Sequence, residues 1–448
     1  MKIKRISVQK YKNLVDFECI FSDSSISSFI GNNGSGKSNL LEVITEVFSF
    51  AKKHCEDTRY NIIVPPEIYG CEIEYEKDGV CYLLKYSKAV VTLYCNEKEL
   101  SRSEMNAALP ESILVYYAGE TARQKRTAVE TLDAKYDHCL KSSNNNTFPG
   151  YKFIDYYSLD DLGLLLLTAA VYQGEYYSKL LDLLKCKEIL PEINIMLKNP
   201  KGKKQENADT YWGARGFVPS FLDALRRYVS STQNLLSNYS MRFSDISLFK
   251  SVSICESEFF TKLKAIKNAG YLDWIVLNLC CNNGETFSFD MLSEGEKQLS
   301  LLFLLTTFTA QDNCLYIFDE FDAYLHLNWQ RQISKMLNDI HMNGHLIFTT
   351  HSPATISNIR SDELYVMKDG QVLYPETETF NRALDEIMLE QMGITMRDPH
   401  IEALYDAFKQ SIADQDKDKA NAIMAELMEI LDENDPIFIK MRLVLRRI

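Results

Sequence analysis

The 448-residue sequence predicts an α/β fold with a mixed or parallel sheet, an antiparallel β lobe, a helical insertion and a helical C-terminal tail. Alternating apolar and polar residues near the N-terminus are typical of half-buried antiparallel strands. A glycine-rich segment joins a short apolar strand to a helical run, and two later apolar runs end abruptly in polar residues. Such strand ends are expected where the carboxyl edge of a parallel sheet is open to solvent.

Residues 1–120 are expected to form an N-terminal lobe of strands around one helix. The runs KIKRISVQ and VDFECIF alternate as the two halves of a hairpin do, and CEIEYEKDGVCYLLKYS contains two alternating runs about a KDG turn. The segment SILVYYAGE predicts a short buried strand from Ile113 to Tyr117. The lobe therefore combines antiparallel strands with one strand of a second sheet.

Three further regions follow this lobe. Residues 121–250 have a mainly helical texture, as in DLGLLLLTAAVYQGEYYSKLLDLLKC, without the sustained heptads of coiled-coil arms. Residues 251–375 return to strands in DWIVLNLCCNNGETFSFDML, CLYIFDE and HLIFTTHS. Residues 376–448 are helical again, and the one-sided apolar faces of IEALYDAFKQ and NAIMAELMEIL are typical of an interaction region.

Composition limits the classes of partner and compartment. The chain has 49 Lys and Arg against 62 Asp and Glu, so its net charge of −13 does not attract nucleic acid without a local basic patch or a partner. None of the eleven cysteines stands in a C-x-x-C motif, which favours a reduced, cytoplasmic setting. The longest apolar run, Leu162 to Val171, is far short of the roughly 20 residues of a membrane span.

The segment FIGNNGSGKSNLLEVI matches G-x-x-x-x-G-K-[ST] through Gly31, Gly36, Lys37 and Ser38, between a strand and a helix. Bare glycines let backbone N–H groups approach phosphates, Lys37 reaches the β and γ phosphates, and Ser38 ligates Mg²⁺. Nucleoside triphosphate binding is therefore predicted. The residues expected to contact ATP here are Gly31, Asn32, Asn33, Gly34, Ser35, Gly36, Lys37, Ser38 and Asn39.

Two later strand ends carry further candidates. In LYIFDEFDAYLHLNWQ, Asp319 is predicted to hold the magnesium shell and Glu320 to polarise the attacking water. In HLIFTTHSP, His351 follows an apolar strand and is predicted to contact the γ-phosphate. A lone histidine is usually structural, and only the position of His351 relative to the other motifs favours a functional role.

The stretch FDMLSEGEKQLSLL reads as a helix start with a capping box, in which Ser293 and Glu296 satisfy each other's backbone N–H groups. Gly295 lies inside the box, where glycine costs about 1 kcal/mol relative to alanine. A helix N-terminus with a serine hydroxyl and a bare glycine suits an anion. We therefore include Ser293, Gly295 and Glu296 among the residues predicted to contact nucleotide.

The order of these motifs resembles the ATPase head of the ABC family, in the branch of SMC, RecF and OLD proteins. GNNGSGKSN, LSEGEKQL, DEFDAYLHLNWQ and FTTHSP are similar to its Walker A, signature, Walker B with D-loop, and H-loop. The resemblance implies a head-to-tail homodimer, in which Ser293 and Gly295 of one chain complete the ATP site of the other. It also implies a glutamine loop, but the first glutamine after Asn39 is Gln124.

The wider ABC family offers three alternative functions. A transporter ATPase is disfavoured by the 130-residue insertion, and an OLD nuclease by a helical tail whose D-x-D pair, Asp414 and Asp416, has no strand before it. A DNA-repair or DNA-clamp ATPase of the RecF or SMC kind would bind DNA, and the lysines of loop 198–205 are candidates for that contact. A solvated loop is the simpler interpretation of these lysines.

The chain most resembles the PtuA ATPases of bacterial Septu anti-phage systems and their retron-associated relatives, including a diffuse similarity over residues 379–445. This resemblance implies a homodimer or higher homo-oligomer that assembles with a separate HNH nuclease of the PtuB type and meets DNA through the complex. Slow ATP hydrolysis with Mg²⁺ and no membrane contact are expected. Activation and inhibition of the nuclease by ATP both fit the residues, because both would use the same pocket.

Overall fold

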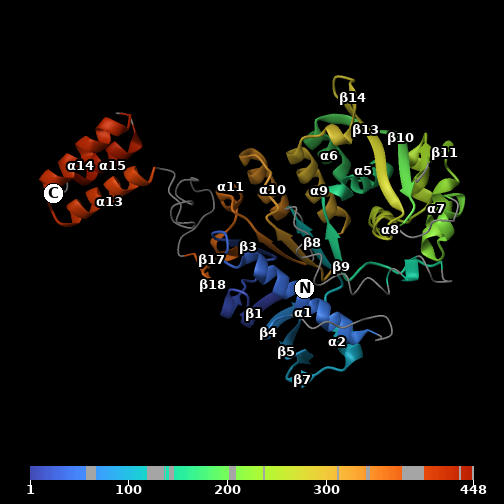
Figure 1. Ribbon diagram of the computed structural model, residues 1–448, viewed down its shortest axis with the longest axis horizontal. Helices are drawn as coiled ribbons and strands as arrows, with labels where there is room; N and C mark the ends of the chain where they lie inside the picture. The colour runs from blue at the N-terminus through green and yellow to red at the C-terminus, as the bar shows by residue number, and fades with distance from the viewer. Residues whose placement is uncertain are drawn as a thin grey trace. The chain divides into compact units, whose positions relative to one another are not determined.

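A computed structural model describes residues 1–56, 67–118, 136, 138–140, 146–200, 208–235, 238–309, 312–339, 344–375, 398–432 and 435–445. The chain divides into two compact units, Met1–Asn381 and Arg382–Ile448. The described part of the larger unit contains three β-sheets (Figure 1). No helix among the described residues has both the length and the apolar character needed to cross a bilayer.

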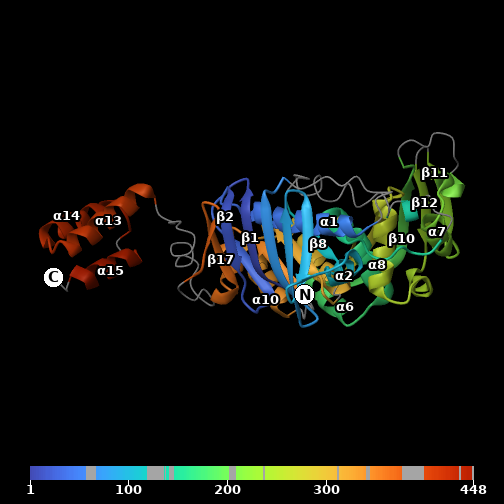
Figure 2. The same ribbon diagram turned by 90° about the horizontal axis from the view of Figure 1, so that it is seen from below.

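The antiparallel lobe is a six-stranded sheet, seen side by side in blue in Figure 2. In spatial order its strands are β2 (Leu14–Ile20), β1 (Lys2–Tyr11), β4 (Gly70–Lys77), β5 (Val80–Ser87), β6 (Val90–Cys95) and β7 (Lys98–Glu99). The short helix α2 (Arg102–Ala108) follows it. Both predicted hairpins are confirmed, because β1 pairs with β2 and β4 pairs with β5 in antiparallel register.

The central sheet has seven strands. In spatial order they are β18 (Gln371–Leu373), β17 (Leu364–Lys368), β3 (Ile26–Ile30), β16 (His345–Thr349), β15 (Leu315–Asp319), β8 (Ile113–Tyr117) and β9 (Ile154–Tyr157). All neighbours are parallel except β17 and β18. Asp319 pairs with Tyr117 and Thr349 pairs with Phe29, so the predicted polar strand ends meet at one edge.

Helix α1 (Lys37–Cys55) is buried between the central sheet and the antiparallel lobe (Figure 1). Its apolar side chains share one core with residues of both sheets, such as Ile6 of β1 and Ile347 of β16. Three more helices belong to the head: α9 (Glu294–Phe308), α10 (Leu327–Asp339) and α11 (Pro353–Ile356). Helix α1, which follows the glycine-rich turn, is therefore held in place by both sheets.

Glu46 lies on this enclosed helix and is 7% exposed. Burial, with a smaller contribution from the neighbouring Glu42 carboxylate, raises its pKa to about 7. A carboxyl whose folded pKa is raised stabilises the fold below its unfolded pKa of 4.5, and this stability is lost as pH rises through about 7. Glu46→Gln should therefore match the native chain near pH 5 and exceed its free energy of unfolding by up to about 3 kcal/mol near pH 8.5.

Urea unfolding of Glu46→Gln and of a control across this pH range measures the effect. The matched control is Glu188→Gln, which changes an exposed carboxylate on a strand. A pH-independent difference between Glu46→Gln and the native chain would contradict the assignment.

The third sheet joins the insertion to the segment before α9. In spatial order its strands are β11 (Ser231–Leu235), β12 (Asn238–Phe243), β10 (Cys186–Lys198), β13 (Leu272–Cys281) and β14 (Thr286–Ser288). The helices packed around it are α5 (Leu162–Tyr172), α6 (Tyr176–Leu184), α7 (Phe217–Arg226) and α8 (Glu256–Asn268). Short 3₁₀ turns at Leu159–Asp161, Ala208–Gly213, Ile246–Ser251 and Phe289–Met291 connect these elements.

The sequence analysis expects a mainly helical texture in residues 121–250 and does not predict β10, β11 or β12. The strand β10 pairs with β13, whose paired residues lie 75 (Leu197 with Leu272) to 95 (Cys186 with Cys281) positions later, and this pairing has no local signal. A register shift between Ile189 and Ile193 surrounds Pro191, where a missing N–H is tolerated. Regions 121–250 and 251–375 thus share one sheet.

The smaller unit is described over three helices, α13 (Pro399–Ala413), α14 (Lys417–Ile430) and α15 (Pro436–Leu445), which share a small apolar core. Their helical character confirms the expectation for this part of 376–448, while residues 376–397 lie outside the described residues. Asp414 ends α13, and Asp416 begins α14 by accepting a hydrogen bond from the backbone N–H of Lys419 at 3.0 Å. The two residues of the D-x-D pair are therefore helix caps, Asp414 at the end of α13 and Asp416 at the start of α14.

Candidate nucleotide-binding site

The glycine-rich loop follows β3 directly and ends where α1 begins, as predicted. Gly31, Gly34 and Gly36 have φ angles of +146°, +80° and +112°, which side chains rarely adopt. A Cβ on Gly31 would lie 2.1 Å from the carbonyl oxygen of Met367, whereas a Cβ on Gly34 would meet nothing within 4 Å. Gly34 and Asn33 are exposed, so this part of the loop presents its backbone to solvent.

The loop is braced by residues outside it. Asn13, in the turn between β1 and β2, donates its amide to the carbonyl of Gly34 at 2.7 Å and accepts from the amide of Asn39 at 2.6 Å. The N–H of Gly370 donates to the carbonyl of Ser35 at 3.0 Å. The side chain of Asn39, predicted to contact nucleotide, thus holds the loop. Asn13 has no recognisable signal in the sequence, because its role depends on a contact between two turns.

The loop carries an enclosed cation and an unpaired hydroxyl. The Lys37 ammonium donates to the carbonyls of Gly31 at 2.8 Å and Asn32 at 3.2 Å, and the residue is 5% exposed. Burial lowers the pKa of Lys37 to about 8, against the attraction of nearby carboxylates. The Ser35 hydroxyl is buried without a hydrogen-bond partner. A buried unpaired hydroxyl beside a buried ammonium fits a phosphate group, whose oxygens would accept from both.

Ser38 and Asp319 meet across the loop and the end of β15. The Ser38 hydroxyl donates to Oδ1 of Asp319 at 3.2 Å, and Thr349 at the end of β16 donates to the same oxygen. Asp319 is 1% exposed, and burial raises its pKa. A hydroxyl and a carboxylate in contact are the oxygen donors that Mg²⁺ prefers, so these residues fit the predicted metal. Thr349 is a positioning residue that the sequence analysis does not single out.

Glu320 and His351 lie together at the same edge. Glu320 has a φ of +49°, and its N–H donates to the Thr349 hydroxyl at 2.9 Å. Its Oε1 lies 3.8 Å from Nε2 of His351, and both side chains are roughly one-third exposed. Burial lowers the pKa of His351, with a further contribution from Lys37, so its imidazole is neutral at pH 7. A partly exposed carboxylate beside a neutral imidazole can orient a water molecule.

A buried network fixes this histidine. Asp322 is 2% exposed and accepts from the Thr350 hydroxyl, and burial raises its pKa to about 6. The Gln330 amide donates to the Asp322 carbonyl at 3.1 Å and accepts from the Ser352 hydroxyl at 2.6 Å. These hydrogen bonds fix Thr350 and Ser352, the residues on either side of His351. The sequence analysis does not predict this network, because its members come from separate segments.

The helix tip at Ser293 has the predicted capping box. The Ser293 hydroxyl accepts from the Glu296 N–H at 3.3 Å, and the Glu296 carboxylate accepts from the Ser293 N–H at 3.0 Å. Ser293 remains exposed. A Cβ on Gly295 would lie 3.5 Å from Trp329, an ordinary contact, so packing within the chain does not require glycine there. The Glu296 carboxylate is engaged in the cap itself.

The glutamine-loop residue and the lysine loop are described only in part. Gln124, the candidate for the glutamine loop, lies outside the described residues, as do Lys201, Lys203 and Lys204. Lys198 ends β10 and forms an ion pair with Asp273 at 2.8 Å. The described part of loop 198–205 therefore has its lysine charge neutralised.

Glu320→Gln tests the water-polarising role. The amide keeps the size of the side chain but cannot accept a proton, so hydrolysis should fall by about 10²- to 10⁴-fold while ATP affinity stays within about two-fold. Single-turnover hydrolysis and nucleotide titration measure the two quantities. Glu99→Gln, an exposed change in the antiparallel lobe, is the control. Native hydrolysis by Glu320→Gln would place the base elsewhere.

Known proteins resemble this chain over most of its length. The chain matches the RecF/RecN/SMC N terminal domain over residues 2–372. The retron Vc95 probable ATPase of Vibrio cholerae serotype O1 biovar El Tor is 24% identical over 435 residues, covering 85% of this chain and 77% of that protein. The retron Ec83 probable ATPase of Escherichia coli is 20% identical over 410 residues, covering 83% and 72%.

A third known protein matches a shorter part of the chain. The DNA replication and repair protein RecF of Parabacteroides distasonis is 44% identical over 63 residues, covering 14% of this chain and 17% of that protein. The domain match spans the glycine-rich loop, the capped helix tip and both polar strand ends. The chain therefore belongs to the RecF/RecN/SMC N terminal domain family and has its ABC-type P-loop ATPase head fold.

Proposed function

We propose that this chain is the ATP-binding and slowly hydrolysing subunit of a bacterial anti-phage defence complex. Two copies close head to tail around ATP and Mg²⁺, and the nucleotide state of this dimer sets the activity of a separate HNH nuclease of the PtuB type. The observation that carries the proposal is the exposed, capped helix tip at Ser293 in a chain that also has a phosphate-binding loop.

The proposed dimer rests on two separate parts of the ATP site, the glycine-rich loop and the helix tip, each of which would contact one side of the phosphates. The loop supplies the Lys37 ammonium and the Ser35 hydroxyl on one side of the phosphates. The exposed tip at Ser293 supplies backbone N–H groups and a helix dipole, which favour an anion. A Cβ on Gly295 would make only ordinary contacts within the chain, so intrachain packing does not explain the glycine, and this supports close approach by a phosphate of the partner copy.

In this dimer the residues act on ATP in distinct ways. Lys37 binds and orients the phosphates, while Ser38 and Asp319 would hold Mg²⁺, which neutralises charge that develops on the phosphate oxygens. Glu320 accepts a proton from the attacking water, and neutral His351 holds the γ-phosphate side of the site. The Asp322 network keeps His351 in place.

The defence assignment is supported by the extent of the relatives. Those named as retron ATPases align with more than four-fifths of this chain, whereas the RecF match covers 14%. The C-terminal unit exposes Ile430, Ile439 and Leu443 by 48%, 62% and 55%. Apolar side chains exposed on a small helical unit support a role in binding another protein.

The genomic neighbour and co-purification test this proposal. We expect an HNH protein to be encoded beside this chain, to co-purify with residues 1–448 and to be lost when the chain ends at residue 375. A neighbouring permease would instead favour transport. An HNH protein that binds the shortened chain equally well would exclude the C-terminal unit as its docking site.

A DNA-repair ATPase of the RecF kind is the second candidate, because the RecF match reaches 44% identity where it applies. Such an enzyme would bind DNA without a nuclease partner. The net charge of −13 disfavours this activity for the isolated chain. Tight, salt-dependent binding of duplex DNA by the purified chain alone, with no HNH neighbour, would favour repair over defence.

A further inference from the structure

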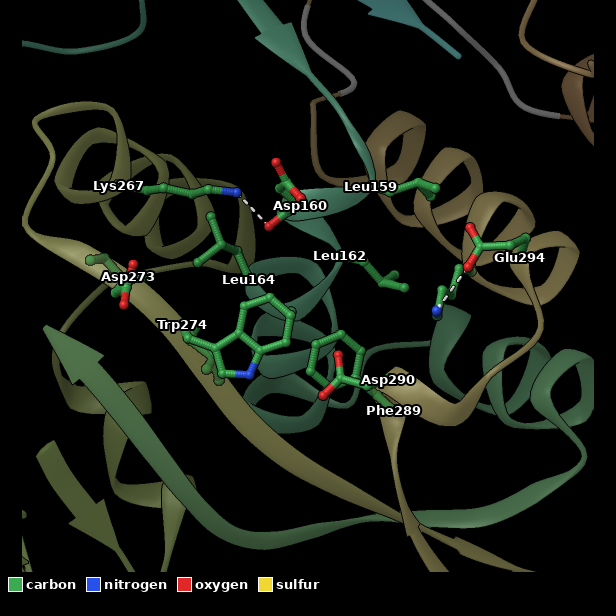
Figure 3. A pocket seen from close by; sticks show the side chains of 14 residues that line it. Leu159, Asp160, Leu162, Leu164, Lys267, Asp273, Trp274, Phe289, Asp290 and Glu294 are labelled. Carbon is green, nitrogen blue, oxygen red and sulfur yellow. Dashed lines mark hydrogen bonds and ion pairs between the residues drawn. The ribbon is translucent and has the colours of Figure 1, made fainter. Parts of the chain in front are cut away.

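A cavity of about 180 Å³ lies beside the capped helix, outside the nucleotide site (Figure 3). Its wall comes from the turn before α5, the start of α5, the end of α8, the start of β13, the turn Phe289–Met291 and the first turn of α9. Pockets for drug-sized ligands usually enclose about 300–1,000 Å³. A single water needs about 10–15 Å³, so this cavity has room for one long side chain.

The cavity has an aromatic surface at its mouth. Trp274 is 42% exposed and stacks on Phe289, with ring centroids 5.9 Å apart and planes 25° apart. The two rings are neighbours in Figure 3. Phe289 is buried against Gly163, where a Cβ would lie 3.3 Å from the ring. The indole is therefore backed by a fixed ring and presents its accessible surface outward. An exposed tryptophan over a cavity is typical of a binding surface.

The charge around the cavity is acidic. Four carboxylates line it against two ammonium groups, a net charge of −2, and the carboxylates belong to Asp160, Asp273, Asp290 and Glu294. Asp160, Asp290 and Glu294 are exposed. A phosphate backbone would be repelled by this rim, and a cation would be attracted.

Both lining cations are already engaged, as the dashed lines in Figure 3 indicate. The Lys267 ammonium contacts the buried carboxylate of Asp161 at 2.8 Å and also donates to the backbone carbonyl of Asp160. The Lys297 ammonium lies 3.0 Å from Glu294. The ion pairs of these cations are formed with Asp161 and Glu294, and Lys267 also interacts electrostatically with Asp160. The rim therefore retains acidic groups for an incoming cation.

We propose that this cavity receives an arginine side chain from a basic segment of a partner protein. A guanidinium stacks on the face of an indole and donates to carboxylates around its edge, and Arg does both better than Lys. Trp274 provides the face, and Asp160 and Asp290 provide the rim. The site would thus select a basic protein segment and reject nucleic acid.

The position of the cavity links such docking to the nucleotide. Phe289 and Asp290 belong to the turn that leads into Ser293, and Glu294 is the first residue of α9. This link rests on the proposed function, in which the Ser293 tip covers the ATP of the partner copy. An arginine held against this turn would favour one position of the tip, so docking and ATP-driven dimerisation would be coupled.

Titration of the full-length, nucleotide-free chain with N-acetyl hexa-arginine amide tests the site directly. We expect saturable quenching of tryptophan fluorescence, with hexalysine binding more weakly and hexaglutamate not binding. Trp274→Ala, and separately Asp160→Asn combined with Asp290→Asn, should each weaken hexa-arginine binding by about ten-fold or more. The control is Asp182→Asn, an exposed acidic residue on α6 that does not line the cavity. Calorimetry reads binding where the tryptophan is removed.

The outcomes separate this inference from the proposed function. Equal hexa-arginine affinity in the native chain and in both sets of variants would overturn the site, even if ATP still drives dimerisation. Absence of ATP-driven dimers with intact, Trp274-dependent peptide binding would overturn the proposed function and leave the site standing. Circular dichroism of each variant confirms folding, and the double Asn variant retains Trp274, so a folding defect in Trp274→Ala does not remove the test.

Discussion

Ser293→Arg is expected to abolish ATP-driven dimerisation while ATP affinity of the single chain stays within about two-fold. The exposed hydroxyl at this position caps α9, and an arginine there would fill the space in which the partner's phosphate must approach. The contacts that the loop is predicted to make with ATP belong to the same chain and would be unchanged. Light scattering with size-exclusion chromatography, in the slow Glu320→Gln background, measures the dimer, and nucleotide titration measures affinity.

The chain offers a matched control for this variant. Ser101 caps α2 with the same capping box, formed with Glu104, in the antiparallel lobe. Ser101→Arg should lose a similar cap energy of about 1 kcal/mol and still form ATP-driven dimers. Normal dimerisation by Ser293→Arg would mean that the helix tip is only a cap. Loss of dimers in both variants would point to a general loss of stability.

Lys37→Ala is expected to lower ATP affinity by about 100-fold or more. The ammonium would make charge-assisted hydrogen bonds to phosphate, each worth about 1.5–3 kcal/mol, and alanine makes none. In the free chain burial lowers the pKa of Lys37, so the ammonium is costly there and its removal should not lower the free energy of unfolding. Nucleotide titration and thermal unfolding with and without ATP measure both effects.

Lys52→Ala is the control for this change, because Lys52 lies on the same helix and contacts Asn106 rather than the loop. It should retain native ATP affinity and the rise in melting temperature that ATP produces. Unchanged affinity in Lys37→Ala would refute the phosphate-binding role of the loop. A Lys37→Ala chain that unfolds at a lower temperature without nucleotide would show that the ammonium supports the fold itself.

Several parts of the fold follow from short-range patterns. Strands β1, β2, β4, β5, β8, β15 and β16 are recognisable because each alternates or forms a brief apolar run bounded by turns. The capping box at Ser293 and Glu296 is a four-residue signal and is present as predicted. The glycine-rich loop lies in its expected context between β3 and α1. These features depend on neighbours in the chain.

Other features depend on contacts between distant segments and have no local signal. Strand β10 is stabilised by β13, so its own residues, with Pro191 at a register shift, do not read as a strand. The positioning residues Asn13, Thr349 and Asp322 become visible only when their partners are known. Their sequence surroundings carry no distinct pattern, because hydroxyl and amide side chains serve turns and caps equally well.

For this protein the sequence by itself determined the α/β class, the glycine-rich loop and the strand ends that carry Asp319, Glu320 and His351. Local periodicity, glycine and capping chemistry are enough for that, since each acts over a few residues. Only the tertiary structure decided how these ends are braced, that the insertion shares a sheet with β13, and that a Trp274 cavity lies beside the capped helix. Those features come from long-range packing, whose partners are far apart in the chain.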